Sequence, residues 1–271
     1  MRIRRHYADG RWGQIHVRIA QAIPTDAPPL LMLHPTPKSG WIWEPLMPAL
    51  AAGRTVIAPD TPAYGASDAP PTPASITDLA EEMLTLMTTL AQDGLIAAGP
   101  FDIVGYHTGS VIAVAMADAA PDRVRRIVPI SLPLYDADER AARMARIAGG
   151  PPLADDGGHL LTMWRHMQTL FDPRIDTGWK QESFTENLRS GPHAYWGYAA
   201  VYGYDLAAAL PRLTQSVLLI APEDDLWEPT RQAFPLITDG ILEPIRGAGH
   251  GLFVLERERI ATMIDSFLQQ S

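Results

Sequence analysis

Short apolar runs alternate with longer stretches of helical periodicity along most of this chain. The runs are bounded by turn residues and predict strands at 12–20, 29–34, 55–59, 101–106, 124–131, 216–221 and 241–246. Apolar residues at helical spacing predict helices at 76–90, 108–120 and 252–268. Strand–helix alternation of this kind is typical of parallel β-α-β units, so we expect an α/β fold.

The first long helix has clear start and stop signals. Ser75 is the expected N-cap, and Asp78 lies three residues further on, as a capping box requires. Gly94 follows the last apolar position and is expected to end the helix.

The middle of the chain has a different pattern. Residues 133–210 contain no clean strand, much helical character and many Met, Trp, Tyr and His residues, with turns expected at 149–152 and 155–158. We interpret this segment as a helical cap inserted into a core formed by residues 1–132 and 211–271.

Composition narrows the possible partners. The chain has 271 residues and a net charge of -9, which argues against nucleic acid because phosphate binding needs a basic surface. The chain has no cysteines, which excludes disulfides and thiolate chemistry. We find neither a signal peptide nor a run of about 20 apolar residues that could span a membrane. We therefore expect a cytoplasmic protein that acts on a small molecule; a homodimer is possible.

A tight turn between the strand at 101–106 and the next helix carries an unusual residue. In Gly105-Tyr106-His107-Thr108-Gly109, small residues stand two before and two after His107. A nucleophile elbow needs this spacing, because its strand and helix pass very close to each other. Centring the turn on Thr108 or Ser110 loses the flanking glycines, so His107 is the central residue.

Several further segments, in a fixed order, resemble the α/β-hydrolase superfamily. They are His34-Pro35-Thr36-Pro37 with Trp41 and Trp43, Val56–Asp60 followed by Tyr64–Asp68, Leu218–Ile220 followed by Glu223-Asp224-Asp225, and Gly247-Ala248-Gly249-His250. The resemblance covers 29–131 and 211–267. It implies an α/β-hydrolase fold, with an eight-stranded, mostly parallel sheet flanked by helices, and a variable cap at 133–210.

The resemblance also implies roles for individual residues. His250 would be the general base, and Asp225 would orient it, with Asp224 as the competing acid. The oxyanion hole would use the backbone N–H groups of Thr36 and Thr108, since the prolines on both sides of Thr36 have none.

Three interpretations of His107 stay open. Its neutral ring could attack as a nucleophile and form an acyl-imidazole. It could instead act as a general base or hydrogen-bond donor in non-covalent chemistry, such as attack by water. Finally, the hydrolase chemistry could be lost, leaving a ligand-binding fold. Retention of Asp225, His250 and the oxyanion segment favours catalysis.

Aromatic residues and histidines are the candidates for the substrate pocket: His34, Trp41, Tyr106, Trp164, Tyr195 and Trp196. His159 and His166 stand seven residues apart, which is a poor spacing for metal ligands, so we expect no metal and no cofactor.

The resulting hypothesis is a cofactor-independent hydrolase of a small ester, lactone or related carbonyl compound, acting through His107, Asp225 and His250. The alternatives are a cofactor-free lyase or C–C bond-cleaving enzyme, and a catalytically silent small-molecule binder.

Overall fold

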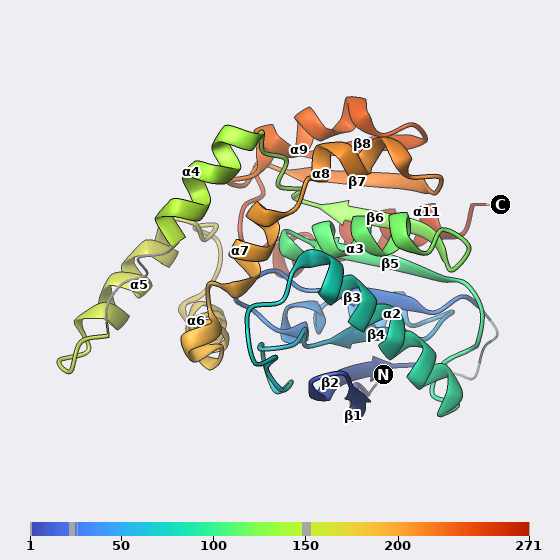
Figure 1. Ribbon diagram of the computed structural model, residues 1–271, viewed down its shortest axis with the longest axis horizontal. Coiled ribbons are helices and arrows are strands. Elements are labelled where there is room, and N and C mark those ends of the chain that lie inside the picture. Colours follow the sequence, from blue (N-terminus) through green and yellow to red (C-terminus); the bar gives the residue numbers. More distant parts are fainter. Residues whose placement is uncertain (1, 22–24, 26, 148–152, 271) are drawn as a thin grey trace.

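A computed structural model describes residues 2–21, 25, 27–147 and 153–270. Its centre is an eight-stranded sheet of order β1-β2-β4-β3-β5-β6-β7-β8 (Figure 1). The strands β3 to β8 are mutually parallel, and β2 joins them through an antiparallel pairing with β4. The predicted fold class, an eight-stranded, mostly parallel α/β sheet, is therefore confirmed.

The strands of the sheet lie close to the predicted runs. They are β1 (Arg4–Gly10), β2 (Gly13–Ala20), β3 (Leu30–Leu33), β4 (Val56–Pro59), β5 (Phe101–Tyr106), β6 (Val124–Ile130), β7 (Ser216–Pro222) and β8 (Gly240–Ile245). The strand β1 was not among the predicted strands. This strand forms the sheet edge and is mostly exposed, so it lacks the apolar alternation that reveals a half-buried strand.

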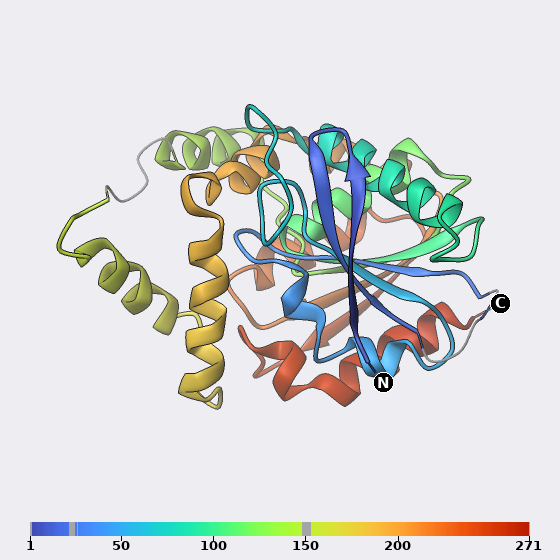
Figure 2. The same ribbon diagram turned by 90° about the horizontal axis from the view of Figure 1, so that it is seen from below.

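Helices cover both faces of the sheet, as Figure 2 shows with α2 on one side and α11 on the other. The helices outside residues 133–210 are α1 (Met47–Leu50), α2 (Ile76–Gln92), α3 (Thr108–Ala119), α9 (Trp227–Ala233), α10 (Leu252–Leu255) and α11 (Arg257–Leu268). Turns of 3-10 helix lie at Gly40–Trp43, Leu210–Arg212 and Phe234–Leu236. The capping box of Ser75 and Asp78 is present at the start of α2.

The single helix predicted over 252–268 is wrong. The chain breaks at Glu256, whose backbone angles (φ -112°, ψ 24°) are not helical, and two helices result. The apolar periodicity gave no sign of this break. Leu252 and Phe253 before it and Ile260 after it are buried in the same cluster, so the pattern continues across it.

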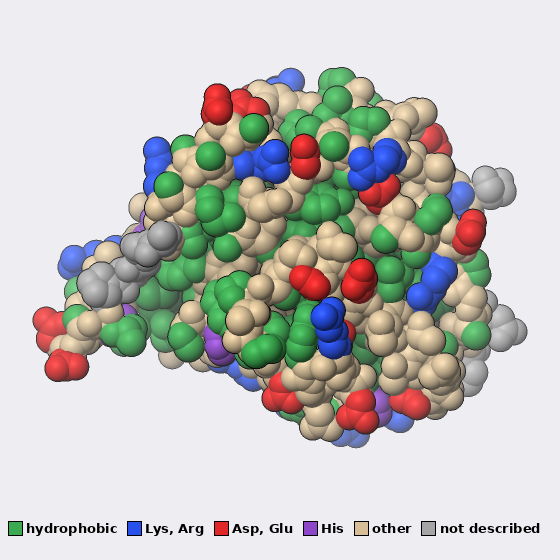
Figure 3. Space-filling view, viewed as in Figure 1, with side chains coloured by type: hydrophobic (Ala, Val, Ile, Leu, Met, Phe, Trp, Pro, Cys, Tyr) green, Lys and Arg blue, Asp and Glu red, His purple; other side chains and the backbone are tan. Residues whose placement is uncertain are grey.

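The segment 133–210 is helical in the structure. It contains α4 (Ala137–Ile147), α5 (Gly158–Gln168), α6 (Thr177–Arg189), α7 (Trp196–Gly203) and α8 (Leu206–Ala209), with a 3-10 turn at Gly191–His193. The turn expected at 149–152 lies outside the described residues, and the one at 155–158 is seen before α5. Hydrophobic side chains reach the surface where α4, α5 and α6 extend from the sheet (Figure 3), among them Met144, Leu160, Leu161 and Leu188. The division into a core and a cap stays a prediction.

Within the described ranges, no helix is both long and apolar enough to cross a membrane.

Candidate active site

The turn from β5 into α3 places His107 in a strained backbone conformation. Its φ is 50° and its ψ is -115°, and a positive φ is rare for a residue with a side chain. The two glycines permit this turn because a Cβ on Gly105 would lie 2.3 Å from the carbonyl oxygen of Gly109. A Cβ on Gly109 would lie 2.1 Å from the carbonyl oxygen of Leu33. The strand β5, the turn into α3 and the neighbouring strand β3 therefore pack so closely that no residue larger than glycine fits at these two positions.

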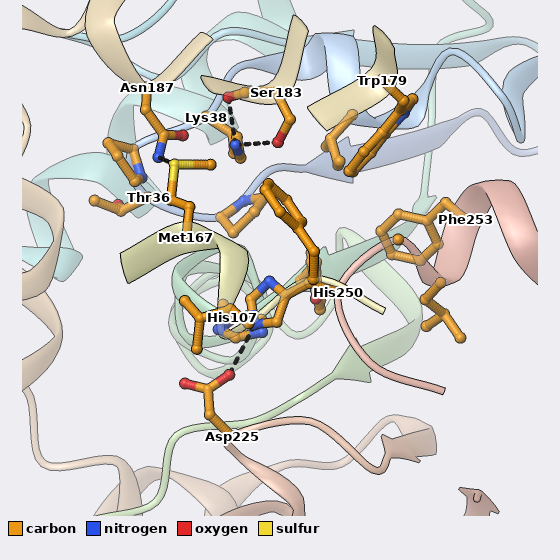
Figure 4. A pocket seen from close by; sticks show the side chains of 18 of the residues that line it. Thr36, Lys38, His107, Met167, Trp179, Ser183, Asn187, Asp225, His250 and Phe253 are labelled. Atoms are coloured by element: carbon orange, nitrogen blue, oxygen red, sulfur yellow. Dashed lines mark hydrogen bonds and ion pairs between the residues drawn. The ribbon is translucent and has the colours of Figure 1, made fainter. Parts of the chain in front are cut away.

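His107 opens onto a cavity that the two other predicted catalytic residues also line. His107 comes from the elbow, Asp225 from the turn after β7, and His250 from the loop before α10 (Figure 4). All three follow the carboxyl ends of parallel strands, where ligand sites of open α/β sheets lie.

Each imidazole has its own carboxylate. His250 donates from Nε2 to Oδ1 of Asp225 at 2.9 Å, as the sequence analysis expected. His107 donates from Nε2 to Oδ2 of Asp224 at 3.3 Å, a pairing that it did not foresee. The ring centroids of His107 and His250 are 5.4 Å apart. The site thus holds two histidine–aspartate pairs, supplied by consecutive aspartates of one turn.

Asp224 is the buried carboxylate of the two. Its side chain is 0% exposed, whereas that of Asp225 is 50% exposed. Besides His107, it accepts hydrogen bonds from Oγ of Ser131 at 2.5 Å and from the backbone N–H of Leu226 at 2.9 Å. Three donors around one buried carboxylate satisfy its hydrogen-bonding capacity without water.

The carboxylates in turn set the charge of His107. Burial lowers the pKa of His107, but the hydrogen bond to Asp224 and the charges of Asp224 and Asp225 outweigh it. The net pKa is raised above the ordinary value of 6.5. Burial likewise raises the pKa of Asp225, but its hydrogen bond with His250 and the charges of both histidines hold it well below its usual range.

The two expected oxyanion residues come from different segments, Thr36 from the loop after β3 and Thr108 from the start of α3. Thr36 lines the cavity and precedes a cis peptide bond to Pro37. Its carbonyl oxygen accepts a hydrogen bond from the hydroxyl of Tyr198 at 2.9 Å, which fixes the orientation of this segment. Thr108 is the first residue of α3 and is buried. Its backbone N–H lies at a helix N-terminus, where negative charge is favoured.

The structure places two of the predicted pocket residues of the core elsewhere. Tyr106 lines the cavity, but His34 does not: its Nε2 accepts from the backbone N–H of Thr61 at 2.9 Å and braces that loop. Trp41 lies behind the cavity wall and packs on Trp179, with ring centroids 5.5 Å apart. The sequence pattern could not separate a residue in the wall from one behind it.

The predicted pocket residues of the helical segment also lie elsewhere. Trp164 packs edge-on against Phe184, and Trp196 packs on His193. Tyr195 lines a different, more open groove beside α5. These aromatics mainly pack helices against one another, as large aromatic residues commonly do.

The cavity wall contains residues that the sequence analysis did not single out. Most of the wall is apolar, and its side chains include Ile42, Met167, Phe171, Trp179, Leu252 and Phe253. Lys38 and Ser183 supply polar groups at the same wall. The position of Lys38, two residues after Thr36, is the only sequence signal that could have identified it.

The same cluster could hold a metal ion. His107, Asp224, Asp225 and His250 offer ligand atoms that lie within 4.8 Å of one another. Two imidazoles and two carboxylates are a donor set that divalent transition metals accept. In the structure both Nε2 atoms already donate to carboxylates, so a bound metal would replace two charge-assisted hydrogen bonds.

Comparison with known proteins agrees with this geometry. The family model described as alpha/beta hydrolase fold matches residues 28–253. The chain therefore belongs to the α/β-hydrolase fold family, and the predicted membership of this superfamily is confirmed.

Individual relatives share limited sequence identity with this chain. The chain is 32% identical over 130 residues to 2-(acetamidomethylene)succinate hydrolase from Mesorhizobium japonicum, a match that covers 48% of this chain and 45% of that protein. This match thus spans less than half of the relative.

Two solved structures have the same fold over nearly the whole chain. An esterase from Rhodococcus sp. ECU1013 superimposes with a TM-score of 0.79 at 21% identity, covering 100% of this chain and 99% of that one. An enol-lactonase from Burkholderia xenovorans LB400 superimposes with a TM-score of 0.76 at 18% identity, covering 98% and 100%.

Proposed function

We propose that this protein hydrolyses a small ester or lactone without a cofactor, by direct attack of water on the carbonyl carbon. The observation that carries this proposal is the convergence of two histidine–aspartate pairs on one cavity. The names of the esterase and the enol-lactonase agree with this class of substrate.

His250 is the general base of the proposed reaction. Its Nε2–H is held by Asp225, so Nδ1 carries the lone pair of the neutral ring. The side chain of His250 is 25% exposed, which lets water reach it. As the oxygen of water bonds to the carbonyl carbon, a proton of that water passes to Nδ1, and Asp225 stabilises the resulting imidazolium.

His107 is the cationic partner in this reaction. Its Nε2 points to the buried carboxylate of Asp224, which favours the protonated ring and leaves Nδ1–H for a ligand. That N–H can donate to the carbonyl oxygen as it becomes negative, together with the backbone N–H groups of Thr36 and Thr108. It can then protonate the leaving oxygen, after which a proton returns from His250 through the solvent in the cavity.

This assignment separates two of the interpretations of His107. A nucleophile needs a neutral ring with a free lone pair, whereas pairing with a buried aspartate favours the imidazolium. Direct attack of water is therefore better supported than an acyl-imidazole. Both paths have the same products, so they differ only in the intermediate.

A panel of chromogenic esters and lactones tests the proposal. We expect His250→Ala and His107→Ala each to lower kcat/KM by about 10²- to 10⁴-fold, the usual contribution of a general acid or base. His166→Ala is the matched control, because that histidine is exposed on α5 outside the cavity. We expect no burst of product, and no acyl adduct on His107 in quenched samples.

Other outcomes would identify the alternatives. A burst together with an adduct on His107 would replace direct attack by a nucleophilic mechanism. Activity that survives His250→Ala would refute the general base. Turnover of a diketone but of no ester would favour the C–C bond-cleaving enzyme, and tight binding without any turnover would favour the silent binder.

A further inference from the structure

Lys38 connects the loop after β3 to α6 at the wall of the cavity. Its Nζ donates to the carbonyl oxygen of Ser183 at 2.6 Å and to Oγ of the same residue at 2.5 Å. Figure 4 shows this ammonium group across the cavity from His107. An ammonium group has three N–H donors, and in the described part of the chain only these two acceptors are found for it.

The carboxylate whose charge acts on Lys38 lies behind the wall and is paired with Arg189. Among the residues that line the cavity, Lys38 is the only Lys or Arg. Glu186, the nearby carboxylate, does not line the cavity; it accepts a hydrogen bond from Oγ of Ser39 and is buried. Burial lowers the pKa of Lys38 to about 7, although the charge of Glu186 opposes this shift. An anion entering the cavity would restore the full charge of the ammonium group.

We propose that Lys38 and Ser183 form an anion subsite that binds a carboxylate group of the substrate. The remaining N–H of Lys38 and the hydroxyl hydrogen of Ser183 would both donate to the carboxylate oxygens. Such charge-assisted hydrogen bonds are the strong ones in a site shielded from water. This inference rests on the proposed hydrolysis and names the class of substrate for it.

The rest of the cavity wall restricts the remainder of that substrate. Met167, Phe171, Trp179 and Phe253 contribute apolar or aromatic surface to it, from α5, the loop after α5, α6 and α10 in turn. A substrate that fits would carry its carboxylate at one end, a short apolar spacer, and the ester or lactone carbonyl at the other end. Hydrolysis would then release an acid with two carboxylates, or with one carboxylate and a hydroxyl group.

A pair of esters tests the subsite. One is the nitrophenyl half-ester of a short dicarboxylic acid, and the other is the nitrophenyl ester in which the far carboxylate is a neutral methyl ester. We expect the wild type to prefer the anionic ester. We expect Lys38→Met to lower kcat/KM for that ester by about 10- to 100-fold while changing the neutral ester little. Lys180→Met is the matched control, since Lys180 is the other lysine of the chain and does not line the cavity.

Binding of the dicarboxylic acid itself, measured by calorimetry, keeps the test independent of turnover. We expect binding to the wild type and to Lys180→Met, and at least tenfold weaker binding to Lys38→Met. If Lys38→Met lowers turnover of both esters equally and leaves binding of the acid unchanged, Lys38 only ties the loop to α6 and the inference is wrong. If neither ester is turned over but the acid still binds through Lys38, the proposed hydrolysis fails and the subsite stands.

Discussion

Replacing Asp224 by Asn removes the charge that holds His107 protonated, while the shape of the side chain is kept. Asp224 accepts hydrogen bonds from His107, Ser131 and Leu226 in a site closed to solvent. Asn has one carbonyl oxygen and one amide, so it cannot accept from all three. We expect the bond with His107 to be lost, because the amide and the imidazolium are both donors there.

The size of the effect follows from the kind of interaction lost. A hydrogen bond between charged groups contributes about 1.5–3 kcal/mol to stability. The folded pKa of His107 is raised above 6.5, its unfolded value. The stabilisation is therefore complete below pH 6.5 and disappears as the pH rises through the folded pKa. We expect Asp224→Asn to be less stable than the wild type by about 1.5–3 kcal/mol near pH 6, and by clearly less near pH 9.

Catalysis should change in the same direction. If His107 must be protonated, the alkaline side of the kcat/KM profile follows its pKa. That side should move to lower pH in Asp224→Asn, and kcat/KM at neutral pH should fall by about 10- to 100-fold. Urea unfolding at the two pH values, the pH profile, and NMR titration of the His107 ring measure these effects separately.

A control isolates the role of the buried charge. Asp239→Asn makes the same change at an exposed carboxylate that bonds to Ser216, and we expect little effect on stability or on the profile. An unchanged pKa of His107 and an unchanged alkaline side of the profile in Asp224→Asn would show that Asp224 does not hold His107 protonated. An equal loss of stability at both pH values would show the same.

Three other changes test the fold and the site. Gly109→Ala should destabilise the protein in urea unfolding by about 3 kcal/mol or more, because the added Cβ would meet the backbone of Leu33. The control Gly53→Ala should be nearly neutral in the same measurement, because a Cβ there has no neighbour within 4 Å. Burial raises the pKa of Asp60, but its hydrogen bond with His16 and the charge of Arg18 outweigh burial and lower that pKa to about 2. The wild type should therefore lose about 2 kcal/mol of stability as the pH falls from about 4 to about 2. In Asp60→Asn, acid unfolding should no longer show this dependence on pH. Zinc at micromolar concentration should inhibit turnover by displacing the histidine–aspartate hydrogen bonds. Dialysis against EDTA should leave activity unchanged, and a loss of activity on dialysis would mean that the site works with a metal.

Most of the sheet could be predicted because parallel strands that are buried on both faces leave continuous apolar runs. The strand β5 has the predicted bounds, and every residue in it is buried. The strand β1 could not be found in this way, since its residues lie at an exposed edge and its order comes from pairing with β2. The break at Glu256 was missed for a similar reason: hydrophobic periodicity reports which face is buried, not whether the backbone is continuous.

The sequence constrains the candidate site best where backbone geometry restricts the choice of residue. The glycines around His107 leave one possible centre for the turn, and the structure gives that residue the positive φ. The pocket wall was predicted poorly because it depends on how helices far apart in sequence pack together. Trp41 and Trp179 illustrate this, since they touch each other, yet only Trp179 lines the cavity.

The pair Asp224-Asp225 is best understood together with the residue at the elbow. In the proposed reaction a single histidine base needs one acid, and Asp225 would meet that need for His250, to which it is hydrogen-bonded. A second histidine at the elbow, held in a buried turn, needs a counter-charge of its own, and the preceding residue of the same turn supplies it. Ser131, itself in a positive-φ conformation, then fixes the second carboxylate from the end of the neighbouring strand. The unusual histidine is thus accompanied by a buried acid that it requires, and this argues that the elbow is built to hold a charge and has not simply lost a nucleophile.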